Sequence, residues 1–297
     1  MYSLPYYIIF GLVWIFSLLP FCILYRISDF LFLITYYCVK YRKKTVLKNL
    51  RTSFPQKPEL EIQQTARRFY RHFCDFLMEY AKGISISSRQ IKKRMVIKDQ
   101  MIFDALEKNN KNFALVSAHY NNWEWLNSMP LHISHKLKII YRPLKNKSFD
   151  RLTKYIRERF GAMLIPMDNI YREALSSKAK NELFTVWFLA DQRPPRNSKL
   201  WTNFLNHEAA FFEGVEKMSR KLDMAVVFMD IQKVRRGYYE VSFKKLFDST
   251  SSAVENEITL ACVREIEAEI INKPDYWLWS HKRFKHSRPE NTKLIAT

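Results

Sequence analysis

The sequence is poor in the residues that make chains flexible or cross-linked. Its 297 residues include only five glycines and four cysteines, while 47% are hydrophobic and 15% aromatic. This composition excludes a disordered tail, a collagen-like repeat and a Gly/Ser-rich linker protein, and the length suits one or two domains with a buried core. The cysteines, at positions 22, 38, 74 and 262, show neither CxxC nor metal-ligand spacing. We therefore expect reduced thiols, no metal site and a body that faces a reducing compartment.

Charge is also absent from the first 25 residues, MYSLPYYIIFGLVWIFSLLPFCILY. As one helix this segment would be about 37 Å long, which exceeds the roughly 30 Å of a bilayer's hydrocarbon core. A cleavable signal peptide would need a basic start, a shorter apolar centre and a small-residue cleavage site, and none of these is present. We expect a membrane anchor that either spans the bilayer or lies in its interface. A buried helix of a soluble protein is the alternative.

A second apolar stretch, Ile27–Val39, contains Asp29 and is too short to span a membrane. We expect it to lie in the interface or to pack on the body. Basic residues follow it at once: Lys40, Arg42, Lys43, Lys44, Lys48 and Arg51. By the positive-inside rule, this side of the anchor is cytoplasmic. The chain thus divides into a membrane anchor, residues 1–39, and a body, residues 40–297.

The body carries the whole formal net charge of +20, because Arg26 and Asp29 cancel within the anchor. Such an excess indicates an anionic membrane surface or another polyanion as partner. A nucleic-acid-binding protein is one alternative, but no zinc-finger spacing, Gly–aromatic motif or Gly-rich loop supports it, and we expect no nucleic acid among the partners. A membrane-attached scaffold without catalytic activity is a second alternative.

Short apolar runs alternate with amphipathic ones in the body, which predicts a three-layer α/β/α domain with a mostly parallel central sheet. The predicted strands are Phe113–Ser117, Leu137–Tyr141, Met163–Pro166, Phe184–Ala190, Ala225–Met229 and Tyr239–Phe243. The predicted helices are Glu59–Lys82, Asp104–Lys108, Trp123–Leu131, Phe149–Phe160, Tyr171–Ala179, Ala210–Leu222 and Val254–Ile271. In such sheets the chemistry gathers at the carboxyl ends of the strands.

One histidine stands at such a strand end. His119 follows the strand Phe113–Ser117, and Glu124 lies five residues later in the first turn of a helix that Asn122 can cap. Across a strand–loop–helix turn the two side chains can meet, as a general base and a carboxylate that orients its ring. A capping or core histidine produces the same spacing by chance, so the spacing leaves both interpretations open.

Longer motifs connect this histidine to a known family. The strings SAHYNNWEW, IIYRPL, LADQRPP and WLWSHKRFK, with NLRTSFP near the N-terminus, resemble in sequence and order the lipid A biosynthesis acyltransferases, the late lauroyl/myristoyl enzymes of lipopolysaccharide synthesis. The resemblance implies an acyltransferase fold with His119 as general base and Glu124 as its partner. It implies transfer of a fatty acyl chain from acyl carrier protein to a hydroxyl of a lipid A precursor or another anionic glycolipid, without cofactor. It places the enzyme at the cell inner membrane, with its catalytic domain on the cytoplasmic side.

The resemblance also implies substrate-binding residues. These are Asn122, Arg142, Asp191, Gln192 and Arg283. Arg142 before a proline can instead end a strand, Asp191 can cap a turn, and the basic tail around Arg283 can simply be solvated. Asn206 stands where familiar members have glycine, and asparagine tolerates a positive φ, so the turn can survive. This departure leaves the acceptor open, and a phosphatidylinositol mannoside or an amino-acid lipid is the alternative.

Overall fold

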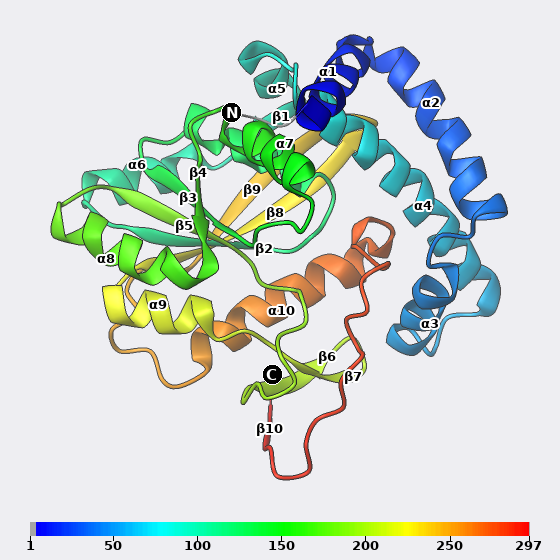
Figure 1. Ribbon diagram of the computed structural model, residues 1–297. Coiled ribbons are helices and arrows are strands. Elements are labelled where there is room, and N and C mark those ends of the chain that lie inside the picture. The colour runs from blue at the N-terminus through cyan, green and yellow to red at the C-terminus, as the bar shows by residue number, and fades with distance from the viewer. Residues whose placement is uncertain (1–3, 297) are drawn as a thin grey trace.

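A seven-stranded sheet forms the centre of the protein in the computed structural model, which describes residues 4–296 (Figure 1). The strands lie in the order β1-β9-β8-β2-β5-β3-β4, and every neighbouring pair except β8 and β9 is parallel. Their bounds are β1 Met95–Ile97, β2 Phe113–Ser117, β3 Lys136–Tyr141, β4 Met163–Pro166, β5 Phe184–Leu189, β8 Ala225–Arg235 and β9 Tyr238–Phe247. The predicted mixed α/β fold with a mostly parallel sheet is confirmed.

Helices cover both faces of the sheet. Alternate residues of β2 enter different cores: Phe113 and Leu115 pack with one set of helices, and Ala114 and Val116 with the other, as strand periodicity requires. The first core includes side chains from α5 Ser88–Arg94, α6 Gln100–Lys108 and the 3₁₀ helix Trp123–Leu131. The second includes side chains from α4 Glu59–Lys82, α8 Ile170–Ala179, α9 Gly214–Leu222 and α10 Glu257–Asn272. The remaining helices of the body are α3 Lys43–Ser53 and α7 Lys147–Glu158.

A small second sheet lies below the main one in Figure 1 and contains a segment that the sequence pattern did not reveal. It consists of β6 Trp201–Phe204, β7 His207–Ala210 and β10 Leu294–Ile295. The helix predicted from Ala210 therefore begins only at Gly214, because β7 occupies the preceding residues. Asn206 has a φ of 60° in the turn between β6 and β7, so the positive φ expected there is confirmed.

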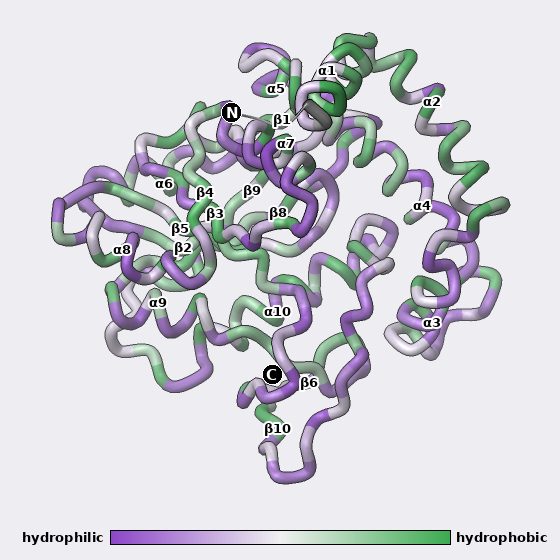
Figure 2. Tube along the Cα trace, viewed as in Figure 1, coloured by the Kyte–Doolittle hydropathy of each residue, from purple (hydrophilic) through white to green (hydrophobic). Residues whose placement is uncertain are grey.

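The N-terminal apolar segment is divided into two helices, so the single helix predicted for residues 1–25 is wrong. Helix α1 covers Leu4–Leu18 and α2 covers Phe21–Leu33, continued by a π turn at Ile34–Cys38. The break falls at Pro20, whose ring fixes φ and whose nitrogen cannot donate to the preceding turn. Within residues 4–296, the one segment long and apolar enough to cross a membrane is Phe21–Cys38 rather than the first 25 residues. Figure 2 shows α1 and much of α2 as hydrophobic.

Candidate active site

The parallel register of β2 and β5 brings a histidine and a carboxylate together. Ser117 is paired with Leu189, and the backbone N–H of Ala190 donates to the Ser117 carbonyl at 3.0 Å. His119 and Asp191 each come two residues after this last pair, so they lie side by side at the edge of the sheet. The distance between His119 Nδ1 and Asp191 Oδ1 is 2.7 Å. This hydrogen bond joins residues that are far apart in the sequence at one edge of the sheet.

The C-terminal segment holds Asp191 from its other side. The indole Nε1 of Trp277 donates to Asp191 Oδ2 at 2.8 Å, and Trp277 forms an antiparallel bridge with Tyr120 directly after His119. Burial opposes ionisation of Asp191, but the neighbouring His119 ring and the Trp277 N–H outweigh it, so the pKa of Asp191 lies below its ordinary value. Asp191 is therefore a buried carboxylate that is charged at neutral pH.

The second nitrogen of the histidine ring faces a cavity. The side-chain amide of Gln192 lies 2.9 Å from His119 Nε2 and can donate to it. With Nδ1–H donating to Asp191, Nε2 keeps its lone pair and is free to accept a proton. This is the tautomer that a general base needs.

The cavity has a volume of about 550 Å³, within the range usual for ligand pockets. His119 and Gln192 line it together with the carboxyl ends of β3 and β5 and with side chains of α8 and α9. Most of its wall is apolar, including Ile139, Ile140, Ile170, Trp187, Phe188, Val215 and Met218. A long apolar group can therefore lie in the cavity with one end near His119.

Cationic side chains also line this cavity. They are Arg142, Arg157, Arg193 and Lys217, and no Asp or Glu is among the described residues of the wall. Of the predicted substrate-binding residues, Arg142 and Gln192 thus lie at the cavity, and Asp191 lies behind it against His119. An apolar wall beside several cations suits an amphiphile that has an anionic group.

The structure corrects the predicted pairing of His119 with Glu124. The Glu124 carboxylate accepts two hydrogen bonds from Arg157 on α7, with Nε to Oε2 at 2.9 Å. This ion pair takes Glu124 away from the imidazole, and Asp191 occupies the position that Glu124 was expected to fill. In the structure Glu124 holds Arg157, which itself lines the cavity.

Asn122 and Arg283, predicted to bind substrate, are not among the residues that line this cavity. Asn122 is buried: its side-chain oxygen accepts from the Trp125 N–H, as predicted for a helix cap, and its amide donates to Glu79 at 2.6 Å. Arg283 is also buried, donates to the Ala210 carbonyl at 2.6 Å and lies over the Phe211 ring. Both side chains are held by the protein's own groups, and their role in substrate binding stays a prediction.

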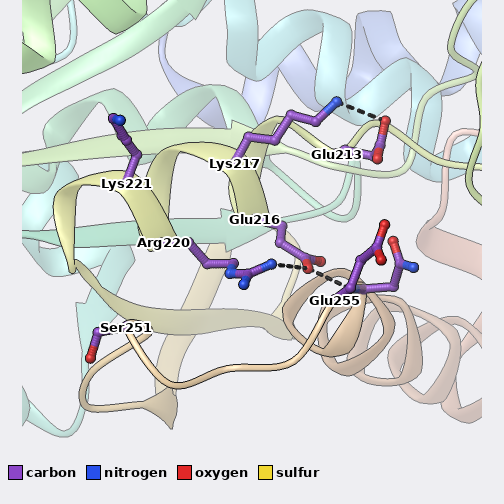
Figure 3. A pocket seen from close by; sticks show the side chains of 8 residues that line it. Glu213, Glu216, Lys217, Arg220, Lys221, Ser251 and Glu255 are labelled. Atoms are coloured by element: carbon purple, nitrogen blue, oxygen red, sulfur yellow. Dashed lines mark hydrogen bonds and ion pairs between the residues drawn. The ribbon is translucent and has the colours of Figure 1, made fainter.

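A second depression lies on the far side of α9 and differs from the cavity in character. Figure 3 shows two ion pairs among its charged side chains: Lys217 reaches Glu213, and Arg220 reaches Glu216. Glu216 also accepts from the backbone of Asn256. Its lining carries three acidic and three basic side chains, whereas the lining of the cavity beside His119 includes cations and no Asp or Glu among its described residues.

Residues 4–296 contain no cluster of three or more His, Cys, Asp or Glu side chains with metal-binding geometry. All four cysteines are free thiols, as the sequence predicted.

The site thus combines a hydrogen-bonded histidine and carboxylate with a mostly apolar cavity that cationic side chains also line. Sequence comparison gives the family. Residues 2–286 match the model of the bacterial lipid A biosynthesis acyltransferases, so the chain belongs to this family and is an acyltransferase. It is 24% identical to the lipid A biosynthesis palmitoleoyltransferase and to the lipid A biosynthesis lauroyltransferase of Escherichia coli K12, over 94% of this chain and 90% of each relative. A lipid A biosynthesis acyltransferase of Haemophilus influenzae is 24% identical over 82% of the chain and 78% of its own length.

The Glu124–Arg157 pair predicts a stability effect. Glu124→Gln leaves the partly buried Arg157 without its counterion, which should lower the free energy of unfolding by about 3 kcal/mol. Adding Arg157→Gln removes the stranded charge and should restore part of that loss. Thermal unfolding of the detergent-solubilised protein measures both effects. As a control, Glu59→Gln breaks the half-exposed pair with Arg51 and should unfold at nearly the parental temperature. Parental stability of Glu124→Gln would contradict this role.

Proposed function

We propose that the protein transfers a fatty acyl chain from an acyl carrier protein to a hydroxyl of a lipid A precursor, with His119 as general base and Asp191 as its partner. The observation that carries the proposal is the Asp191–His119–Gln192 chain of hydrogen bonds, which leaves Nε2 facing an apolar cavity. The family supports the reaction class, and two relatives that act in lipid A biosynthesis support the acceptor.

The reaction follows from this geometry. The acceptor hydroxyl displaces the Gln192 amide at His119 Nε2 and gives its proton to that nitrogen as its oxygen attacks the thioester carbonyl carbon. Asp191 accepts the Nδ1–H and stabilises the imidazolium that forms. The tetrahedral intermediate then collapses with cleavage of the carbon–sulfur bond, and the imidazolium returns the proton to the leaving thiolate. An ester and a free carrier thiol result.

The cavity wall has two kinds of side chain, and each kind suits a different part of the substrate. Its apolar side chains from β3, β5, α8 and α9 suit the acyl chain, and Arg142 and Arg157 suit an anionic group such as a phosphate of the glycolipid. Glu124 contributes to substrate binding in this proposal by fixing Arg157. The same cavity can receive another anionic amphiphile, such as a phosphatidylinositol mannoside, and mass spectrometry of the acylated lipids distinguishes these acceptors.

The N-terminal helices indicate where in the cell the protein lies. Phe21–Cys38 is apolar enough for membrane anchoring, and Lys40, Arg42, Lys43 and Lys44 follow it. Because these basic residues suit the anionic headgroups of the cytoplasmic leaflet, we place the protein at the cell inner membrane with residues 40–297, the acyltransferase domain, on the cytoplasmic side. Acyl carrier protein, the proposed donor, is a soluble protein and would meet the cavity there.

His119→Ala should reduce turnover about 10²- to 10⁴-fold, the usual contribution of a general base. The assay is transfer of a labelled acyl chain from acyl carrier protein to a purified lipid A precursor, using solubilised variants whose thermal unfolding matches the parent. His132→Ala is the matched control, because His132 does not line the cavity. Near-parental turnover of a folded His119→Ala variant would remove His119 from the mechanism.

The donor proposal predicts an electrostatic effect. Acyl carrier proteins are acidic, and Lys217, which is exposed and pairs with Glu213, lines the cavity. Lys217→Glu should raise KM for the acylated carrier by about 3- to 10-fold and weaken the dependence of kcat/KM on salt, because a charge at the edge of an interface steers encounter. Lys108→Glu on α6, which packs on the opposite face of the sheet, changes the net charge equally and should have little effect. Equal effects of the two variants, or better use of coenzyme A thioesters without salt dependence, would contradict a docking site beside the cavity.

A further inference from the structure

Helix α2 packs against the body along its length. Leu24, Ser28, Phe32 and Tyr36 recur at four-residue intervals and are all buried. They face α4, which runs beside α2 in Figure 1. At one end of this contact the rings of Tyr36 and Tyr70 pack together. At the other end the Lys82 ammonium donates to the carbonyl of Leu19, just before α2.

Buried polar groups also hold α2 against α4. Ser28 donates to Asp75 at 2.7 Å, and Tyr25 donates to Glu79 at 2.9 Å, both carboxylates lying on α4. Arg236 bridges Asp75 and Asp29 of α2, with N–O distances of 2.6 and 2.7 Å. Because Asp75 and Glu79 are buried, withdrawing α2 would strip hydrogen bonds from two buried carboxylates, which is unfavourable.

Helix α1 is fastened as well. Ile9, Phe10 and Val13 pack with Leu152 and Ile156 of α7. At its C-terminal end, the Ser17 carbonyl accepts hydrogen bonds from Lys82 and from the Ser85 hydroxyl. With 15 residues, α1 is also roughly 22 Å long, shorter than the hydrocarbon core of a bilayer.

The outward faces of both helices are apolar and exposed. On α1 these residues include Ile8, Leu12, Ile15 and Leu18, and on α2 they include Ile23, Phe30 and Leu33. Exposed apolar area on consecutive helices needs an apolar partner, and Figure 2 shows both helices as hydrophobic beside a polar α3. The basic residues from Lys40 to Lys44 suit the anionic headgroups of a phospholipid leaflet as that partner.

A position across the bilayer conflicts with these contacts. If α2 spanned the membrane while bound to α4, the Asp29–Arg236 pair near its middle would lie in the hydrocarbon region, and so would Arg71, which lies over the Phe32 ring. Charged side chains at that depth are strongly disfavoured. We propose that neither helix crosses the membrane: α1 and α2 lie in the single leaflet that faces the body, with their apolar sides in the lipid. This proposal is independent of the acyl-transfer chemistry.

The full-length chain provides a test through an epitope at its N-terminus and the native thiol of Cys22, in the first turn of α2. Cys22 and Cys38 are exposed and Cys74 and Cys262 are buried, so Cys38→Ser leaves Cys22 as the reactive site among the described residues. The protein is probed in sealed inner-membrane vesicles of both orientations, with a protease for the epitope and a membrane-impermeant maleimide for Cys22. Ser251→Cys in a Cys22→Ser/Cys38→Ser background reports the side of the body.

We expect the epitope to be digested only in the vesicles that expose residue 251, and Cys22 to be unreactive from the opposite side. An epitope digested from the opposite side would show that one helix spans the bilayer. An epitope on the body's side with Cys22 labelled from the other side would show that both helices cross as a hairpin. Either result overturns the proposal, and neither depends on enzymatic activity.

Discussion

The hydrogen bond between His119 Nδ1 and Asp191 Oδ1 is the interaction on which the site depends. It exists because β2 and β5 are parallel neighbours in a register that ends both strands at the same level. A shift of that register by one residue would turn one of the two side chains to the opposite face of the sheet. The buried strands Phe113–Ser117 and Phe184–Leu189 therefore fix the chemistry through their packing, with the functional side chains following directly after them.

The C-terminal segment completes this arrangement and links it to the N-terminal part of the body. Trp277 donates to Asp191, while the Asn49 amide of α3 donates to the carbonyls of Trp279 and His281, each at 2.9 Å. The motifs NLRTSFP and WLWSHKRFK, at opposite ends of the body, are thus in contact. Through these buried groups, both motifs help to hold the Asp191 carboxylate in place.

The sequence alone predicted several local elements correctly, but it did not predict features that depend on contacts between distant residues. The strands Phe113–Ser117 and Met163–Pro166 and the helix Glu59–Lys82 match the structure residue for residue, because the strands are short apolar runs and the helix has apolar residues at three- and four-residue spacing. The partner of His119 was missed, because sequence proximity favoured Glu124, whereas the Glu124–Arg157 pair depends on how α7 packs. The signal that could have found it was the position of Asp191, two residues after a neighbouring strand. Leu205 and Asn206, with positive φ, form a hairpin turn that no glycine marks.

The central claim is that Asp191, and not Glu124, is the carboxylate that activates His119. The most direct measurement is the turnover of Asp191→Asn against that of Glu124→Gln, each corrected for the fraction of folded protein. Asp191→Asn keeps the shape of the side chain but removes the charge that stabilises the imidazolium, so its turnover should fall by about 10²- to 10⁴-fold, as expected when a general base loses its partner. Folded Glu124→Gln should keep most of its turnover at saturating substrate. Loss of turnover in Glu124→Gln with near-parental turnover in Asp191→Asn would contradict the account.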